Sequence, residues 1–334
     1  MRRPTRWRLF LTLCATLTLT ACVPLQHTPC GLRPVECVRE VPHGGLIREA
    51  TAAEAAANRA ADLVIESADG HVEFVRVPQI CHEFMSKLLH LDQPQSTDSK
   101  MSNQSQNMAS KVPDGWIASA GVYQMDSSPP SLLHSFSGRW TVPPAPTNPA
   151  RPETLYYFIG LEDRTQGKLT NIHQPVLTWG DETEGGLYPG RWHLWSWTCC
   201  PKNLTWHSPD VAGFVPGDTV FGTIEKVGGS TWRVDAAFRD ATAGGVFRNT
   251  TLLSQVGGYN YNYADVTLEV YNVSTCLQMA DGASNFAQLN LKLAGGQAWV
   301  PPTWYVTGLP TNCHAKVSIV NATSMAITSG SASG

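Results

Sequence analysis

Short runs in which apolar and polar residues alternate fill the chain from about residue 116 onward, separated by clusters of Gly, Pro and Asn. Such runs, rich in Val, Trp, Tyr, Phe and Thr, predict β-strands, because successive side chains of a strand point to opposite faces of its sheet. Nine strands are predicted in this way, at residues 136–144, 154–162, 174–180, 191–197, 218–227, 230–238, 264–273, 286–293 and 315–320. Many strands at this spacing favour a two-sheet sandwich or jelly roll.

The pattern before residue 93 is different. Residues 47–66 are rich in Ala with interspersed charges, which predicts a helix. Residues 71–77 alternate as a strand, and residues 81–91 return to helical spacing. We therefore expect a small α+β unit over residues 23–92, which is a prosegment or an accessory unit.

The two units are expected to be joined by a linker. Residues 93–112 are polar and hold almost no large aliphatic side chains, so they cannot bury enough apolar surface to fold alone. The β-sandwich domain is expected over residues 113–326, followed by a flexible tail over residues 327–334.

The N-terminus predicts export. A basic segment, MRRPTRWR, precedes the apolar stretch LFLTLCATLTLTAC, which is too short to span a bilayer, so residues 1–22 are predicted to be a signal peptide. The box from Leu19 to Cys22 resembles a bacterial lipoprotein cleavage box, in which Cys22 becomes the lipidated first residue. Ordinary signal cleavage is the alternative. We expect a secreted or extracytoplasmic protein, anchored to the membrane through Cys22 in the first case.

The charge of the chain bears on its binding partners, and its cysteine content bears on its disulfides. The net charge of −3 and the lack of a basic stripe give no reason to expect nucleic acid. In an oxidising compartment the nine cysteines, which show no CxxC spacing, are expected to form disulfides. Cys276 and Cys313 flank the last strand-rich stretch, and Cys30 with Cys37 forms a local candidate pair, but the connectivity stays open. No metal or cofactor is expected.

Common catalytic motifs are absent: the chain has no HExxH, GxSxG, P-loop or GxGxxG opening a helix. A polar pair on strands remains. In ADVTLEVYNV the apolar residues alternate with Asp265, Thr267 and Glu269, so one face packs on the core and the other carries two carboxylates. By the same alternation Gln174 shares a face with Val176. If the two strands are neighbours on the concave side of a sheet, Gln174 and Glu269 face one cleft.

Such a pair has a chemical use. A glutamate with an ordinary pKa near about 4 is partly ionised in mildly acidic solution and can deprotonate a water. A glutamine amide offers neutral donors to the oxyanion of a tetrahedral intermediate. The alternative for Gln174 is a hydrogen bond to a neighbouring loop inside the sandwich. The alternative for Glu269 is a solvated position on a polar strand face.

Six segments, in order across residues 136–270, resemble the glutamic peptidases, the eqolisin family of acid proteases. RWTVPP and YYFIGLED resemble the W-x-VP entry and the WVGIDG strand of that family. IHQPVLTW resembles its ILQTG strand, and RWHLWSW resembles WYEWYP. VPGDTVFGTI resembles its SEGDSI strand, and ADVTLE matches the A-E-x-x-x-E strand in length and register.

The resemblance implies an all-β, concanavalin A-like two-sheet β-sandwich with Gln174 and Glu269 as the catalytic dyad on its concave face. In this reading Glu269 activates water and later protonates the leaving amine, while Gln174 polarises the scissile carbonyl. Phe158 and Trp192 fall where aromatic residues line the substrate cleft of the family. Members of the family are made with a prosegment, which agrees with the N-terminal unit.

The chain departs from the family at acids that support the site. Glu162 and Thr178 stand where the family has Asp, and Leu194 replaces the Glu of WYEWYP. The first acid of the last motif is Asp265. We predict that Glu162 and Asp265 are substrate-binding residues. Because the residues around the dyad differ from those of the family, an inactive homologue remains an alternative.

The leading hypothesis is a secreted acid endopeptidase that acts as a monomer on polypeptide substrates. The alternative is a non-catalytic, lectin-like carbohydrate-binding β-sandwich or an inactive peptidase homologue. The two readings are separated by one geometric feature, which is whether Gln174 and Glu269 converge on one open cleft within reach of a single water.

Overall fold

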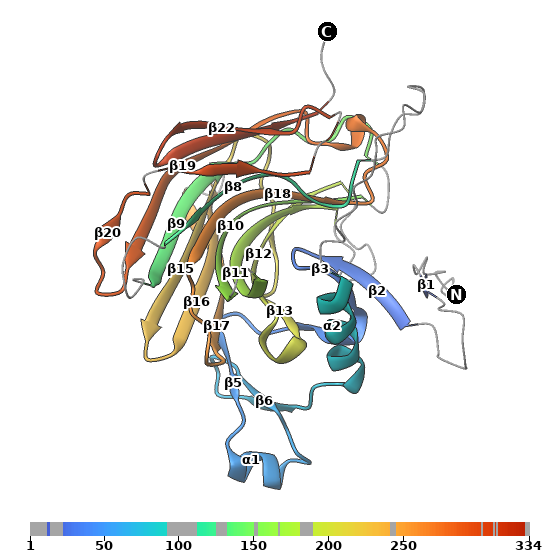
Figure 1. Cartoon of the computed structure of the whole chain (residues 1–334), viewed down its shortest axis with the longest axis vertical. Coiled ribbons are helices and arrows are strands. Elements are labelled where there is room, and N and C mark those ends of the chain that lie inside the picture. The colour runs from blue at the N-terminus through green and yellow to red at the C-terminus, as the bar shows by residue number, and fades with distance from the viewer. Residues whose placement is uncertain are drawn as a thin grey trace.

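The computed structural model describes residues 12–13, 23–91, 112–124, 132–149, 153–165, 168–180, 190–240, 245–301, 303–309, 311 and 313–330. Two large, mostly antiparallel sheets pack face to face, and the N-terminal strands and helices lie against one end of them (Figure 1). The predicted all-β, two-sheet sandwich is confirmed.

One sheet, called here the concave sheet, carries the candidate site. Its strand order is β21-β8-β18-β10-β11-β12-β13-β4, with β14 paired to β12. All neighbours are antiparallel except β13 and β4. The strands span, in that order, Tyr305–Thr307, Gly115–Tyr123, Tyr263–Tyr271, Thr154–Thr165, Lys168–Trp179, Trp192–Cys199, Thr205–His207 and Val38–Glu40, and β14 spans Val211–Ala212.

The other sheet, called here the outer sheet, has the order β22-β23-β19-β9-β15-β16-β17-β5-β6-β7, with β20 paired to β19. Its strands span, in that order, Lys316–Asn321, Ser324–Ser329, Gly282–Leu293, Leu133–Thr141, Thr219–Gly228, Thr231–Asp240, Val246–Gln255, Gly45–Glu49, Leu63–Glu66 and Val72–Val75, and β20 spans Ala298–Trp299.

The main hydrophobic core lies between the two sheets. Strands β8, β10, β11, β12 and β18 of the concave sheet send alternate side chains into it, among them Leu155, Leu177 and Val266, and the outer sheet contributes Trp140 and Phe286. Burial of these side chains supplies most of the stabilisation, at roughly 1.5–3 kcal/mol for each large apolar side chain. The alternation in the sequence therefore reports directly which face of each strand meets the core.

All nine predicted strands are present, as β9, β10, β11, β12, β15, β16, β18, β19 and β22. Strands β8, β17 and β23 were missed. Strand β8 reads GWIASAGVY, whose small residues resemble a loop, yet Gly121 faces Tyr263 across the sheet, and its lack of a side chain makes room for the phenol ring. Strand β17 carries the polar run RNTT on an exposed stretch.

The predicted helix over residues 47–66 is wrong in extent. Only α1, Ala52–Ala57, is helical, with Thr51 and Glu54 forming a capping box at its start. The residues after it, Arg59 and Ala60, adopt positive φ angles of 53° and 58°, which ends the helix. The following LVIE sequence is β-branched in part and forms β6 between β5 and β7. The predicted strand at 71–77 and helix at 81–91 are present as β7 and as α2, Gln79–Leu91.

The N-terminal segment shares both sheets with the rest of the chain. Strand β4 pairs in parallel with β13 of the concave sheet, and β5 pairs in parallel with β17 of the outer sheet. A second core, which includes Ile47, Leu63, Trp206 and Leu252, joins the two parts. The assignment of this segment as a prosegment or accessory unit stays a prediction.

The segment begins with a hairpin of its own. Strands β2, Val23–Thr28, and β3, Gly31–Pro34, are joined by a two-residue turn at Pro29 and Cys30, and β1, Thr12–Leu13, pairs with β2. We call β2, the turn and β3 the hairpin. The short 3-10 helices are η1, Val35–Cys37, η2, Pro201–Asn203, and η3, Cys276–Gln278.

Three other predictions concern the ends and the linker. The signal peptide with Cys22 lies outside the described residues apart from Thr12–Leu13, and so does the linker except Val112, which is buried. The tail predicted from residue 327 is wrong at its start, because β23 runs to Ser329 and buries Ile327. None of the described helices is long and apolar enough to cross a membrane.

The described residues form three disulfides, and these correct the pairing predicted between Cys30 and Cys37. Cys276 pairs with Cys313, and Cys37 pairs with Cys81 on α2. Cys30 does not pair with Cys37 but with Cys199 at the end of β12. The two cysteines are 169 residues apart in sequence, so no local spacing pattern could have indicated this pair.

Candidate active site

The candidate site lies on the concave face, which is the face of the concave sheet turned away from the outer sheet. Gln174 on β11 and Glu269 on β18 both belong to this face, as the alternation predicts. The two strands are not neighbours, because β10 lies between them. The register that pairs Phe158 with Val176 brings Gln174 opposite Gly160, and Gly160 pairs with Asp265. Glu269 lies four residues further along β18 on the same face.

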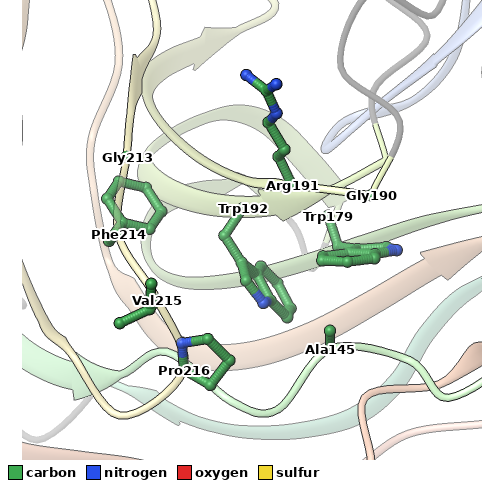
Figure 2. A pocket seen from close by; sticks show the side chains of 9 residues that line it. All are labelled: Ala145, Trp179, Gly190, Arg191, Trp192, Gly213, Phe214, Val215 and Pro216. Carbon is green, nitrogen blue, oxygen red and sulfur yellow. The ribbon is translucent and has the colours of Figure 1, made fainter.

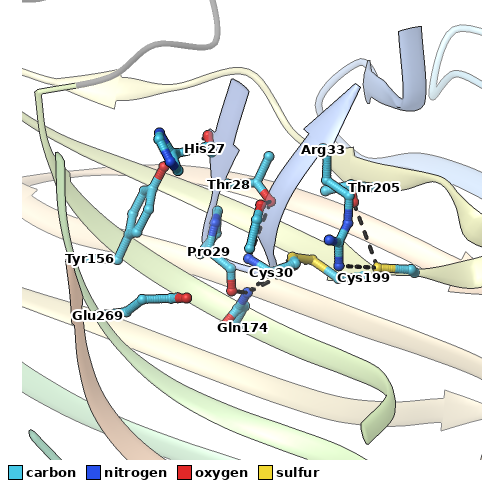
Figure 3. Close-up of a disulfide and its surroundings, with 12 residues drawn as sticks. His27, Thr28, Pro29, Cys30, Arg33, Tyr156, Gln174, Cys199, Thr205 and Glu269 are labelled. Carbon is cyan, nitrogen blue, oxygen red and sulfur yellow. Dashed lines mark hydrogen bonds between the residues drawn. A yellow bond between two sulfur atoms is a disulfide. The ribbon is translucent and has the colours of Figure 1, made fainter. Parts of the chain in front are cut away.

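The hairpin fills the space above these residues (Figure 3). The Gln174 amide nitrogen Nε2 donates a 2.8 Å hydrogen bond to the Pro29 carbonyl oxygen at the hairpin tip. Figure 3 shows the Glu269 carboxyl group directed toward Pro29 and the Gln174 amide. Gln174 is 0% exposed and Glu269 is 2% exposed. Gln174 and Glu269 therefore lie on one face, but the expected open cleft is not present, because the hairpin fills the space above both side chains. By the criterion given in the sequence analysis, this closed arrangement favours the non-catalytic alternative, and catalysis requires that the hairpin leave this face.

Burial changes the acid chemistry of Glu269. Desolvation raises the pKa of its carboxyl group to about 8, although the hydrogen bond from the Tyr271 hydroxyl group and the nearby charge of Arg33 both favour the ionised form. The expectation of an ordinary glutamate pKa is therefore wrong for the closed arrangement. With the hairpin in place Glu269 is protonated in acidic and neutral solution, and it cannot serve as a base there.

A second pair of carboxyl groups lies beside the dyad. Burial raises the pKa of Asp265 well above its usual value, and the nearby Glu162 raises it further. The Thr267 hydroxyl group donates a 2.7 Å hydrogen bond to Asp265 Oδ1. Glu162 accepts hydrogen bonds from the Arg164 guanidinium group, one of them at 3.2 Å. Glu162 and Asp265 are thus both buried, Glu162 in an ion pair with Arg164, while burial favours the neutral form of Asp265.

Gly160 makes this arrangement fit. A Cβ atom at this position would collide with the Asp265 carboxyl group and would lie 3.0 Å from Ile172 Cδ1. The absence of a side chain therefore leaves the space between Gln174 and Asp265 to the carboxyl group.

Aromatic side chains form the walls of the concave face. Phe158 lies there, as predicted, with its ring 5.9 Å from Trp116. Sequence analysis did not assign four other members of this wall: Tyr156, Trp195, Trp197 and Tyr271. Alternation within RWHLWSW could have indicated two of them, because it puts Trp195 and Trp197 on one face of the strand. Trp197 pairs with Gln174, and Trp195 pairs with Val176, on the neighbouring strand β11.

The same alternation places Trp192 elsewhere, which corrects its assignment to the substrate cleft. Trp192 and Leu194 point into the core between the sheets. Trp192 lines a pocket of about 340 Å³ with Trp179, Phe214 and other residues (Figure 2). Trp179 and Trp192 are only 4% and 3% exposed, so neither presents an open ring face on which a sugar could stack.

A buried histidine also belongs to the concave face. The His207 ring lies 4.8 Å from that of Trp197, and burial lowers the pKa of His207 to about 4. Within the described residues no three His, Cys, Asp or Glu side chains are grouped so that they could hold a metal ion.

Comparisons with known proteins give distant structural neighbours. No protein-family model matches the chain, and no curated protein matches it. Among solved structures, scytalido-glutamic peptidase with a peptide-based transition state analogue is 14% identical, with a TM-score of 0.47 over 65% of this chain and 99% of that one. SCP-B, a member of the eqolisin family in complex with the tripeptide Ala-Ile-His, is 14% identical, with a TM-score of 0.45 over the same shares. These values are too low to assign an activity.

Proposed function

We propose that the chain is a glutamic-peptidase-like endopeptidase that hydrolyses peptide bonds with Gln174 and Glu269. The observation that carries the proposal is the hydrogen bond from Gln174 Nε2 to the peptide carbonyl oxygen of Pro29. The Glu269 carboxyl group is directed toward the same residue (Figure 3). The concave face already holds polypeptide, and the amide proposed to bind a substrate carbonyl binds a carbonyl of the chain itself.

The mechanism follows from the two groups. When a substrate replaces the hairpin, water returns to the cleft, and the pKa of Glu269 falls toward its ordinary value because desolvation is its largest cause of elevation. The carboxylate then takes a proton from a water molecule, whose oxygen attacks the scissile carbonyl carbon. Gln174 donates a hydrogen bond to the resulting oxyanion, and Glu269 returns the proton to the leaving amine.

Surrounding residues have supporting roles in this proposal. Phe158, Trp195 and Trp197 give the cleft apolar walls for substrate side chains, and the buried pair of Glu162 and Asp265 supports the floor next to Gln174. The neutral state of Asp265 leaves the region between the dyad residues without a second negative charge, which would otherwise disfavour ionisation of Glu269.

Export is part of the proposal. Three disulfides suit an oxidising compartment outside the cytoplasm. Cleavage of residues 1–22 and lipidation of Cys22 are the two routes, and the mass of the mature N-terminal peptide distinguishes them. We expect a monomer that acts on polypeptides, which sedimentation at several concentrations checks.

The test is proteolysis of a denatured protein at acidic pH by the full chain, assayed with and without a dithiol. Glu269→Gln is expected to abolish cleavage, and Gln174→Ala to reduce kcat by about 10²–10³-fold, the usual effect of removing an oxyanion donor. Gln255→Ala, at an exposed glutamine of β17, and Glu73→Gln, at an exposed glutamate of β7, are the matched controls. Absence of cleavage under both conditions, or equal activity of Glu269→Gln, would refute the peptidase assignment.

A further inference from the structure

The hairpin lies outside the strand pairing of the two large sheets. Its strands pair with each other and with β1 but, among the described residues, with no strand of the two large sheets. The residues directly after it are fixed: β4 joins the concave sheet, and Cys37 is bonded to Cys81 on α2. The hairpin is therefore a flap attached at a firm base, and its position over the concave face depends on side-chain contacts and one covalent bond.

The contacts are directed at the candidate site itself. Besides the bond from Gln174 to Pro29, the Tyr156 hydroxyl group donates a 3.2 Å hydrogen bond to the His27 carbonyl oxygen. The His27 ring stacks on Tyr271 at 4.5 Å, and Tyr271 in turn donates to Glu269. The hairpin thus occupies the amide of Gln174 and covers the ring of Tyr271, whose hydroxyl group contacts Glu269.

The covalent bond lies next to the contact with Gln174. Cys30 follows Pro29 at the tip, and its disulfide to Cys199 has a Cα–Cα distance of 6.1 Å. Cys199 pairs with Ile172, two residues from Gln174, so the bond crosses from the hairpin tip to the floor of the cleft. A substrate peptide cannot reach Gln174 while this bond holds the tip in place.

We propose that the hairpin is an autoinhibitory flap and that the Cys30–Cys199 disulfide is a redox modification site that controls access to the cleft. The autoinhibitory role rests on the proposed peptidase function, whereas the covering of the face by a tethered hairpin does not. Opening is a two-electron reduction by a dithiol: one thiolate of the dithiol attacks one sulfur of the disulfide and releases the other cysteine as a thiolate, which takes up a proton. The second thiolate of the dithiol then attacks the sulfur of the reductant in this mixed disulfide and releases the remaining cysteine. The products are Cys30 thiol, Cys199 thiol and the oxidised, cyclic disulfide of the reductant.

The experiment compares the full oxidised chain with Cys30→Ser, which removes the tether and leaves the other two disulfides. Cys200→Ser is the matched control, because it removes the neighbouring free thiol and keeps the tether. Two readouts do not depend on catalysis: hydrogen exchange of the peptide covering residues 23–34, and hydroxyl-radical labelling of Trp195 and Trp197. Acid proteolysis is the third readout.

For Cys30→Ser we expect at least tenfold faster exchange in the hairpin, several-fold more labelling of the two tryptophans and at least tenfold faster proteolysis. Cys200→Ser should behave as the parent in all three. If exchange and labelling stay at parental values in Cys30→Ser, the tether does not hold the flap and the proposal is overturned. It is also overturned if the parent is already as active as Cys30→Ser. Faster exchange and labelling without proteolysis in any variant would support a releasable cover and would refute the peptidase.

A second experiment tests the same proposal on the parent protein and is used if Cys30→Ser folds poorly. The parent is reduced stepwise with dithiothreitol, and the freed thiols are located by mass spectrometry. Labelling of Trp197 is expected to rise in proportion to free Cys30 and Cys199. A rise that follows only the thiols of Cys37 or Cys276 would contradict the assignment to this disulfide.

Discussion

One face of the concave sheet meets the outer sheet through side chains such as Leu177 and Val266, which are buried by strands of the same sandwich. The opposite face carries Gln174, Asp265 and Glu269, and it is buried by a hairpin from the start of the chain. The first face is apolar and permanently covered. In our proposal burial of the second face ends when the flap opens, so polar and titratable groups are kept in a dry environment until a substrate enters.

The largest expected difference between the faces is in packing. Leu177 and Val176 are adjacent on β11, fully buried, and point to opposite faces. We expect Leu177→Ala to lower the free energy of unfolding by about 2–5 kcal/mol, and Val176→Ala by about 1–2 kcal/mol. In a Cys30→Ser background the loss of unfolding free energy caused by Val176→Ala should become smaller, because the hairpin that covers Val176 is released. The loss caused by Leu177→Ala should stay the same. Urea unfolding of the four variants checks this, and equal shrinkage at both positions would contradict the distinction between the faces.

The next effect is on the pH dependence of stability. Glu269 has a pKa of about 8 in the folded chain against an ordinary value of 4.5, so between these pH values the unfolded chain ionises first. Its contribution is fully present below about pH 4.5 and is lost as pH rises toward 8, by at most ~1.4 kcal/mol per pH unit. The difference in unfolding free energy between parent and Glu269→Gln, measured from pH 4.5 to 8, should follow this slope. A constant difference would show that Glu269 is not desolvated in solution.

His207 gives a smaller effect of opposite sign. Burial lowers its pKa from 6.5 to about 4, so the unfolded chain binds a proton first as the pH falls. Stability from this group is present above about pH 6.5 and declines toward pH 4, by ~1–2 kcal/mol between pH 7 and 5. His207→Gln should remove this part of the acid sensitivity in urea titrations. His173 lies on the core side, and burial lowers its pKa to about 3. The acid sensitivity of the unfolding free energy that comes from His173 should therefore remain in that variant.

The smallest effect is expected at the proposed oxyanion donor. Gln174 Nε2 donates to the Pro29 carbonyl oxygen and makes weaker contacts to the sulfur atoms of Cys30 and Cys199, which stabilise the fold. The buried Gln174 Oε1 has no hydrogen-bond partner among the described residues, which opposes this contribution. Gln174→Met should change the free energy of unfolding by less than ~1 kcal/mol while it abolishes proteolysis. A loss above ~2 kcal/mol, measured by urea unfolding, would mark Gln174 as a structural residue.

The spacing and alternation of the strands were enough to predict the sandwich, because the strands of a sandwich must separate apolar from polar side chains. Alternation gave Gln174 and Glu269 each a face within its own strand, and the family resemblance supplied the expectation that the two faces are the same. Alternation could not give the strand order that inserts β10 between them, since pairing of distant strands leaves no local pattern. The cover over the dyad was beyond reach for the same reason: Pro29 lies 145 residues from Gln174. Trp192 was misassigned because the resemblance was followed where alternation indicated the core.

The separation of 169 residues between Cys30 and Cys199 also sets an order of events for a chain exported as it is made. At typical rates of synthesis the hairpin waits roughly ten to thirty seconds for the strand it will cover. During that time Cys37, seven residues away, and later Cys81 are the only partners within the segment. Early oxidation therefore favours wrong pairs with Cys30, and the native link forms late or by reshuffling in an isomerase-rich compartment.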